Sequence, residues 1–360
     1  MRLSKPLIYN SFILIILVLL NMSKLSKFTF EQSSMIQPNK GVIHTPKEFI
    51  RPLDATILEY PEWYLVYSSE EFATYTTNHF PSEFPFFAEI WQYWDAYYKA
   101  NHLIQALKTR NWDDQVMLMV IGSSTTAEYF LRGLYEISFG NVSAKISGRV
   151  AEDDYAAKVV AEYVEFIKRE PWYEFDFMHS LKNLWTENTF FGKGFFRKLE
   201  RKYILSSEYL IKASYGKLIG LASHAAFGVA EVKTAVLITN LPPAFTYSRE
   251  DVSILNNDNK GNALLLVPRL AQFTEYANLL ASQNIQFQEI AGNNAFITLS
   301  ILVGPNWQKE CDASAILYKQ AILTSPGMTR VMLAVPVEQL GSMLLGLKKS
   351  HQLIEHIYDY

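Results

Sequence analysis

Two stretches near the carboxyl end decide the fold: LLLVPRLAQFTEYANLLASQNIQFQEI from Leu264 and VMLAVPVEQLGSMLLGLKKSHQLIEHI from Val331. Each has the pattern of an aliphatic strand, a Val-Pro pair, a helix of about three turns and a second strand. Pro268 and Pro336 come just after the first strand, where the fixed φ of proline suits a first helical turn. The repeated pattern therefore predicts two βαβ units.

Short strand-like runs continue through the region from Glu231 to the end of the chain. Gly292-Asn293-Asn294 separates two of these runs and predicts a hairpin turn. Two βαβ units around a hairpin resemble the split βαβ arrangement of ferredoxin-like domains, a single sheet with helices on one face. The expected strands are 235–239, 263–267, 286–290, 295–302, 330–335 and 353–358.

Residues 58–228 have apolar side chains at helical spacing, with Pro or Gly between the periodic stretches. This pattern predicts a helical domain. Acidic runs at Asp113 and Glu152 favour helix starts because negative charge complements the helix dipole, and Pro171 stops the helix before it. The expected helices are 61–78, 84–109, 113–139, 152–170, 174–188 and 195–226.

The amino-terminal run Leu7–Met22, LIYNSFILIILVLLNM, has no charged residue; Arg2 and Lys5 precede it, and Lys24 and Lys27 follow it. As a helix it would span about 24 Å, slightly less than the roughly 30 Å hydrocarbon core of a bilayer. The residues after it lack the small side chains of a signal-peptide cleavage site. We expect an uncleaved single-pass anchor; a cleaved signal peptide and a buried helix are the alternatives.

The predicted organisation is α+β with four parts: a membrane anchor at 1–27, an extended stalk at 28–57, a helical domain at 58–232 and a ferredoxin-like α+β domain at 233–360. The basic flanks slightly favour an amino terminus inside the cell, which places the bulk of the chain outside the cytoplasm. The single cysteine, Cys311, suits that location because it cannot form an intramolecular disulfide. The expected partners are membrane lipid, through the anchor, and an envelope protein.

Composition and motifs exclude other classes of function. Lys and Arg number 33 against 36 Asp and Glu, so the basic surface that nucleic acid requires is not expected. The sequence has no zinc-binding pattern, phosphate loop or nucleophile–base motif, and we expect no metal and no cofactor. The favoured interpretation is a non-catalytic binding or assembly protein of the cell envelope; the alternative is an enzyme or small-ligand sensor with a polar site in the helical domain.

A polar site is suggested by Gly122-Ser-Ser-Thr-Thr-Ala127, small residues in the middle of an expected helix. Either another helix approaches closely there or the hydroxyls line a small pocket. Three charged residues follow at a spacing of four, which gives a solvated ladder or part of a polar site. A histidine after Asp176 has either a capping or a ligand role. The candidate ligand-binding residues are Ser123, Ser124, Thr125, Glu128, Arg132, Glu136 and His179.

A second unusual stretch combines four phenylalanines with basic residues between 190 and 202. In a tethered protein, Phe suits the acyl boundary of a bilayer and Lys or Arg suits anionic headgroups. The alternative is a connecting loop whose Phe residues enter the core beside a solvated basic helix face. The candidate membrane-contact residues are Phe190, Phe191, Lys193, Phe195, Phe196, Arg197 and Lys198.

Overall fold

The structure is a computed structural model. It describes residues 43–107, 112–187, 189, 191–227, 233–242, 251–258, 260–308 and 314–360. The described residues all belong to one compact unit, Ile36–Tyr360. The predicted anchor, the first half of the predicted stalk (28–42), Phe190 and Cys311 lie outside the described residues, as does the predicted domain boundary at 228–232.

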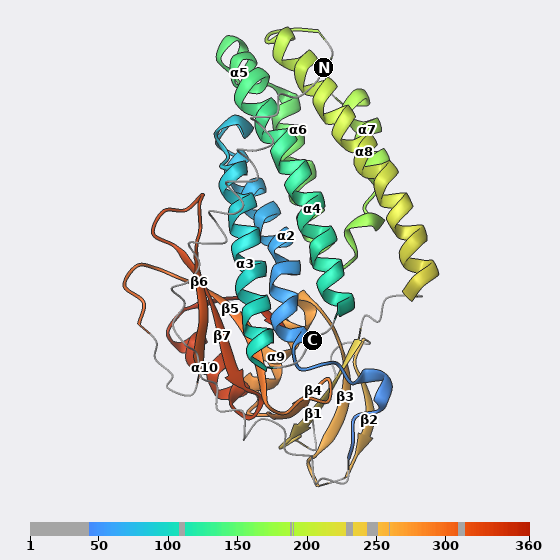
Figure 1. Cartoon of the computed structure of the whole chain (residues 1–360), viewed down its shortest axis with the longest axis vertical. Coiled ribbons are helices and arrows are strands. Elements are labelled where there is room, and N and C mark those ends of the chain that lie inside the picture. Colours follow the sequence, from blue (N-terminus) through green and yellow to red (C-terminus); the bar gives the residue numbers. More distant parts are fainter. Residues whose placement is uncertain are drawn as a thin grey trace. The chain divides into compact units, whose positions relative to one another are not determined.

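Long helices make up the part of the chain before residue 228 (Figure 1). These helices are α2 (Ala55–Thr76), α3 (Phe86–Leu107), α4 (Trp112–Tyr135), α5 (Asn141–Ser147), α6 (Ala151–Ile167), α7 (Phe177–Thr186) and α8 (Phe195–Phe227). Two further helices, α9 (Ala271–Ser282) and α10 (Leu340–Lys349), belong to the carboxyl-terminal region. Each of the six helices expected before residue 228 is present. A π-helical turn, η4 (Glu136–Gly140), joins α4 to α5, so the third expected helix runs on past residue 139.

Helix α2 begins six residues earlier than expected because Pro61 lies inside it and not in its first turn. Its aromatic side chains are largely buried: Tyr60, Trp63 and Tyr67 pack against Tyr358 of the carboxyl-terminal region. The aromatic residues of α2 thus form a core that joins the helices to a β-sheet.

The carboxyl-terminal region contains two four-stranded sheets in which every neighbouring pair is antiparallel. The first, in the order β2-β3-β1-β4, consists of β1 (Lys233–Thr239), β2 (Ser253–Asn257), β3 (Ala263–Pro268) and β4 (Gln286–Ile290). The second, in the order β6-β7-β5-β8, consists of β5 (Phe296–Val303), β6 (Ala315–Ala321), β7 (Thr329–Pro336) and β8 (Leu353–Tyr358). The predicted α+β class is therefore confirmed.

The two predicted βαβ units do not share one sheet. Strands β3 and β4 pair with opposite edges of β1, and both are antiparallel to it, so β3 and β4 are parallel to each other. Helix α9 connects β3 to β4. Strands β7 and β8, connected by α10, have the same arrangement around β5. The expected hairpin at residue 292 instead connects the two sheets, with only an isolated bridge between Ile290 and Asn293. Positive φ angles at Ala291 and Gly292 turn the chain out of the first sheet.

Sequence periodicity did not predict the edge strands β2 and β6. All five residues of β2 are exposed, and β6 is mostly exposed or half-buried. An edge strand with little burial lacks the apolar alternation by which strands are recognised. The other six strands, including the edge strands β4 and β8, were predicted because they contribute to one hydrophobic core together with α9 and α10.

Candidate functional site

A small polar cavity of about 60 Å³ lies between α2, α4, α6 and α8. Three of the predicted ligand-binding residues line it: Thr125, Glu128 and Arg132 of α4. Glu208 and Lys212 of α8 complete its polar wall, and the sequence analysis had not selected them. Their spacing of four, equal to that of Glu128 and Arg132, was the only signal in the sequence.

The charges around this cavity compensate one another. Arg132 Nη1 lies 3.3 Å from Glu208 Oε1, and Lys212 Nζ lies 2.9 Å from Glu128 Oε1 and 3.0 Å from Glu208 Oε1. Burial alone raises the pKa of Glu208, but the positive charges of Arg132 and Lys212 outweigh burial and lower its pKa to about 2. The charged row of α4 therefore faces α8 and is not a solvated ladder.

Tyr209 also lines this cavity, and its hydroxyl is buried without a hydrogen-bond partner among the described residues. A buried hydroxyl without a partner favours a water molecule or a very small polar ligand. Since one water needs roughly 10–15 Å³, the cavity holds at most a few water molecules.

A second buried ion-pair cluster lies nearer the start of α8. Arg201 Nη1 and Nη2 donate to Glu136 at 2.9 and 3.1 Å, and Arg201 Nη2 also donates to Glu200 at 2.6 Å. Arg197 Nη2 donates to Asp153 at 2.7 Å. The predicted ligand residue Glu136 is thus held by an arginine and lies outside the cavity.

Two of the three basic residues of the predicted membrane contact, Arg197 and Lys198, point into the protein. Arg197 is fully buried, and Lys198 is buried with its Nζ donating to the Thr189 carbonyl at 3.0 Å. Neither can reach lipid headgroups in this arrangement. Buried basic residues need carboxylates or carbonyls close by, and Asp153 of α6 provides such a partner for Arg197.

The phenylalanines of the same stretch have the opposite orientation. Phe196 is 72% exposed, and Phe191 and Phe195 are also exposed, as is Lys193. The stretch therefore presents apolar rings to the outside and most of its positive charge to the interior.

The remaining predicted ligand residues do not line the cavity. Ser123 is exposed, and Ser124 donates to the Val120 carbonyl at 2.9 Å within its own helix. His179 is exposed on α7, where its backbone N–H donates to the Asp176 side chain at 2.8 Å, so Asp176 is the helix cap.

Gly122 marks a close approach of α3 to α4. A Cβ atom at this position would overlap the Tyr93 ring and lie 3.1 Å from Trp94 Cη2. Tyr93 is buried and donates from its hydroxyl to the Leu118 carbonyl at 2.6 Å, so its ring cannot move aside freely. The small residues here therefore accommodate a neighbouring helix, and Trp94 Nε1 donates to Thr126 at 2.9 Å.

We expect Gly122→Ala to lower the free energy of unfolding by about 1–2 kcal/mol, because overpacking costs more than alanine gains as a helix former. Urea unfolding followed by circular dichroism measures the change. Ser123→Ala, at an exposed position of the same helix, is the matched control and is expected to stay within about 0.5 kcal/mol of the unsubstituted protein. A Gly122→Ala protein as stable as this control would contradict the close approach.

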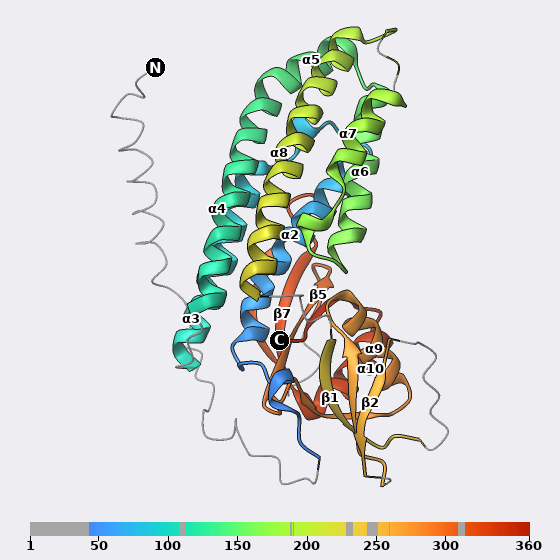
Figure 2. The same ribbon diagram turned by 90° about the vertical axis from the view of Figure 1, so that its right-hand side faces the viewer.

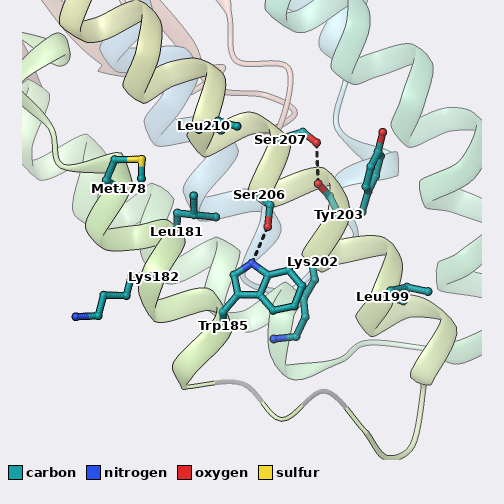
Figure 3. A pocket seen from close by; sticks show the side chains of 10 residues that line it. All are labelled: Met178, Leu181, Lys182, Trp185, Leu199, Lys202, Tyr203, Ser206, Ser207 and Leu210. Atoms are coloured by element: carbon teal, nitrogen blue, oxygen red, sulfur yellow. Dashed lines mark hydrogen bonds between the residues drawn. The ribbon is translucent and has the colours of Figure 1, made fainter.

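An apolar groove of about 600 Å³ runs between α7 and α8 (Figure 3). Trp185 forms one side and donates from Nε1 to Ser206 Oγ at 2.9 Å, while Lys202 Nζ lies 4.9 Å from the Trp185 ring centre. Lys202 also donates to the Leu184 carbonyl at 2.9 Å, which fixes it in the wall. The other lining residues are Met178, Leu181, Lys182, Leu199, Tyr203, Ser207 and Leu210.

A buried Glu–His pair connects α2 to β8. Glu59 Oε1 lies 3.2 Å from His356 Nε2 and accepts a hydrogen bond from Trp63 Nε1 at 3.1 Å, and the Trp63 and His356 rings stack at 3.5 Å. Burial raises the pKa of Glu59 to about 7 and lowers the pKa of His356 to about 3. The sequence offered no signal for this pair, because the two residues are far apart along the chain.

Within the described part of the chain, no group of three or more His, Cys, Asp and Glu side chains is placed to hold a metal ion. None of the described helices combines the length and the hydropathy needed to cross a membrane. No family model, no curated protein and no solved structure matches the chain.

Proposed function

We propose that this protein is a non-catalytic binding or assembly protein of a cell envelope, anchored in the membrane by a single pass at residues 7–22 with the bulk of the chain outside the cytoplasm. The observation that carries the proposal is the polarity of α4, α5 and α8. Most of their charged side chains pair inside the protein, whereas large apolar side chains such as Leu131, Ile146 and Phe196 are exposed. Contiguous exposed apolar surface is typical of binding sites for proteins or membranes.

A small-ligand sensor is the second candidate, and it is favoured by Tyr209, which lines the polar cavity and has a buried hydroxyl without a partner among the described residues. Its ligand would be no larger than a few water molecules. A thermal-shift screen with small polar compounds tests it, because a ligand that binds only the folded protein raises the melting temperature. A ferredoxin-like relationship of the carboxyl-terminal region also stays a proposal, supported by the split βαβ unit in each sheet.

The anchor makes a direct test of the proposed function. We expect the full chain to stay in the membrane pellet after carbonate extraction, and we expect an intact-mass measurement to show that residues 7–22 are retained. Protease added to the outside of intact cells, stripped of any outer barrier, should digest the protein. The proposal would be contradicted if carbonate released the protein or if the mature amino terminus lay after residue 22. It would also be contradicted if external protease left the protein intact while protease added to inverted vesicles digested it. Deletion of residues 7–22 is the matched control and should release the protein.

A further inference from the structure

The outward side of α4, α5 and α8 forms one apolar surface, which we call the α4–α8 face. Helices α4 and α8 lie side by side (Figure 2), and ion pairs between Arg132 and Glu208 and between Glu136 and Arg201 join their inner edges. The large side chains on the other edges are exposed, among them Leu131 and Ile211 at 66% each. Helix α8 alone has 33 residues and a length of about 50 Å.

The unpaired charge among the described side chains of this face has one sign. Of the residues in α4, η4, α5 and α8 whose side chains are described, Lys145 and Lys217 are exposed without an ion-pair partner, whereas the Glu128 side chain, 39% exposed, is paired with Lys212 Nζ at 2.9 Å. Glu200 and Glu208 are turned inward and paired with Arg197, Arg201, Arg132 or Lys212. An anion that meets this face must therefore come from its partner.

We infer that the α4–α8 face rests on a phospholipid bilayer, with its apolar side chains in the acyl boundary and Lys145 and Lys217 at headgroup phosphates. This deepens the proposed function and rests on it, because a domain tethered to a membrane meets the bilayer at high effective concentration. Helices with an apolar face, an oppositely directed charged face and lysine at the edge lie in the membrane interface.

A second copy of the chain fits this face less well. Two copies joined through it would bury Lys145 and Lys217 without an unpaired carboxylate opposite, because the carboxylates described in these helices are already paired with basic residues of the same chain. Unpaired buried charge is costly, whereas headgroup phosphates neutralise these lysines in the interface. The apolar groove between α7 and α8 adjoins the face through Leu199, Tyr203 and Leu210, so the surface offered to lipid extends into it.

The orientation of the basic residues sets the mode of binding. Arg197, Lys198, Arg201 and Lys202 are buried and paired inside the protein. The attraction to lipid therefore comes mainly from the burial of apolar surface. Contact should persist on zwitterionic phosphatidylcholine and in high salt, which screens electrostatic attraction.

The test uses the full chain with Cys311→Ser, reconstituted into phosphatidylcholine vesicles through its own anchor. Leu131→Cys and Ile211→Cys each receive an environment-sensitive fluorescent label, and Ala161→Cys, at an exposed position on α6, is the matched control. We expect blue-shifted emission at 131 and 211, with at least threefold stronger quenching by lipids that have spin labels on their acyl chains, and neither effect at 161. The quenching should be unchanged in 0.5 M salt.

The other outcomes overturn the inference in distinct ways. Blue-shifted emission without lipid quenching would show that protein, a second copy included, covers the face. Water-like emission at 131 and 211 would show that the face is open, and quenching lost in high salt would show an electrostatic contact. Equal melting temperatures establish that all variants fold, and carbonate extraction of the same samples shows separately whether the anchor holds.

Discussion

Arg201→Met is expected to lower the free energy of unfolding by about 3–5 kcal/mol, the largest effect of any single substitution considered for this protein. Arg201 and Glu136 are each 1% exposed in their side chains and form two hydrogen bonds, at 2.9 and 3.1 Å. Methionine fills similar space but leaves the Glu136 carboxylate buried without its cation. Urea unfolding of the full chain in detergent micelles, followed by circular dichroism, measures the loss.

Two further variants make this test specific. Lys158→Met removes an exposed pair with Glu162, 3.8 Å away on α6, and should change the free energy by less than about 0.5 kcal/mol. Adding Glu136→Leu to Arg201→Met should restore much of the loss, because the uncompensated charge is gone. If Arg201→Met cost no more than Lys158→Met, the buried cluster between α4 and α8 would not exist as described.

Glu59→Gln is expected to stabilise the protein above neutral pH by about 3 kcal/mol and to leave its stability unchanged near pH 4.5. Burial raises the pKa of Glu59 from 4.5 to about 7. The unfolded chain therefore loses this proton near pH 4.5 while the folded protein keeps it. The stability from this group is fully present below pH 4.5 and is lost as the pH rises through 7.

Glutamine cannot ionise, so the variant avoids this loss, and its side-chain oxygen can still accept from Trp63 Nε1 and His356 Nε2. His356 has a lowered pKa, so its contribution to the free energy of unfolding is present above pH 6.5 and is lost as the pH falls toward 3. The unsubstituted protein and the Glu59→Gln variant share this contribution, so it does not affect the difference between them. Unfolding free energies measured from pH 4.5 to 8.5 give the difference curve. The exposed Glu162→Gln is the control, and a difference that did not grow with pH would contradict a buried, protonated Glu59.

Local sequence was sufficient to predict elements that bury an apolar face. The repeated Val-Pro pattern at Pro268 and Pro336 correctly indicated two strand–helix–strand units, because β3, β4, β7 and β8 together with α9 and α10 supply core residues. The all-exposed β2 gave no such signal. The two units lie in separate sheets because β1 and β5 each pair with two neighbouring strands. Pairing between segments that are distant in the chain leaves no local sequence pattern, so the sequence did not predict this division.

For the candidate site, the sequence by itself determined that Glu128, Arg132 and Glu136 form one row, because a spacing of four aligns side chains on a helix. It also determined that Phe and basic residues lie together at the start of α8. Only the tertiary structure decided which way they point. The carboxylates of Glu136 in η4 and Asp153 in α6 lie opposite α8, and pairing with them costs less than leaving buried charges alone. The cations therefore turn inward, the apolar side chains remain outside, and the surface polarity of these helices is the reverse of that of a solvated helix.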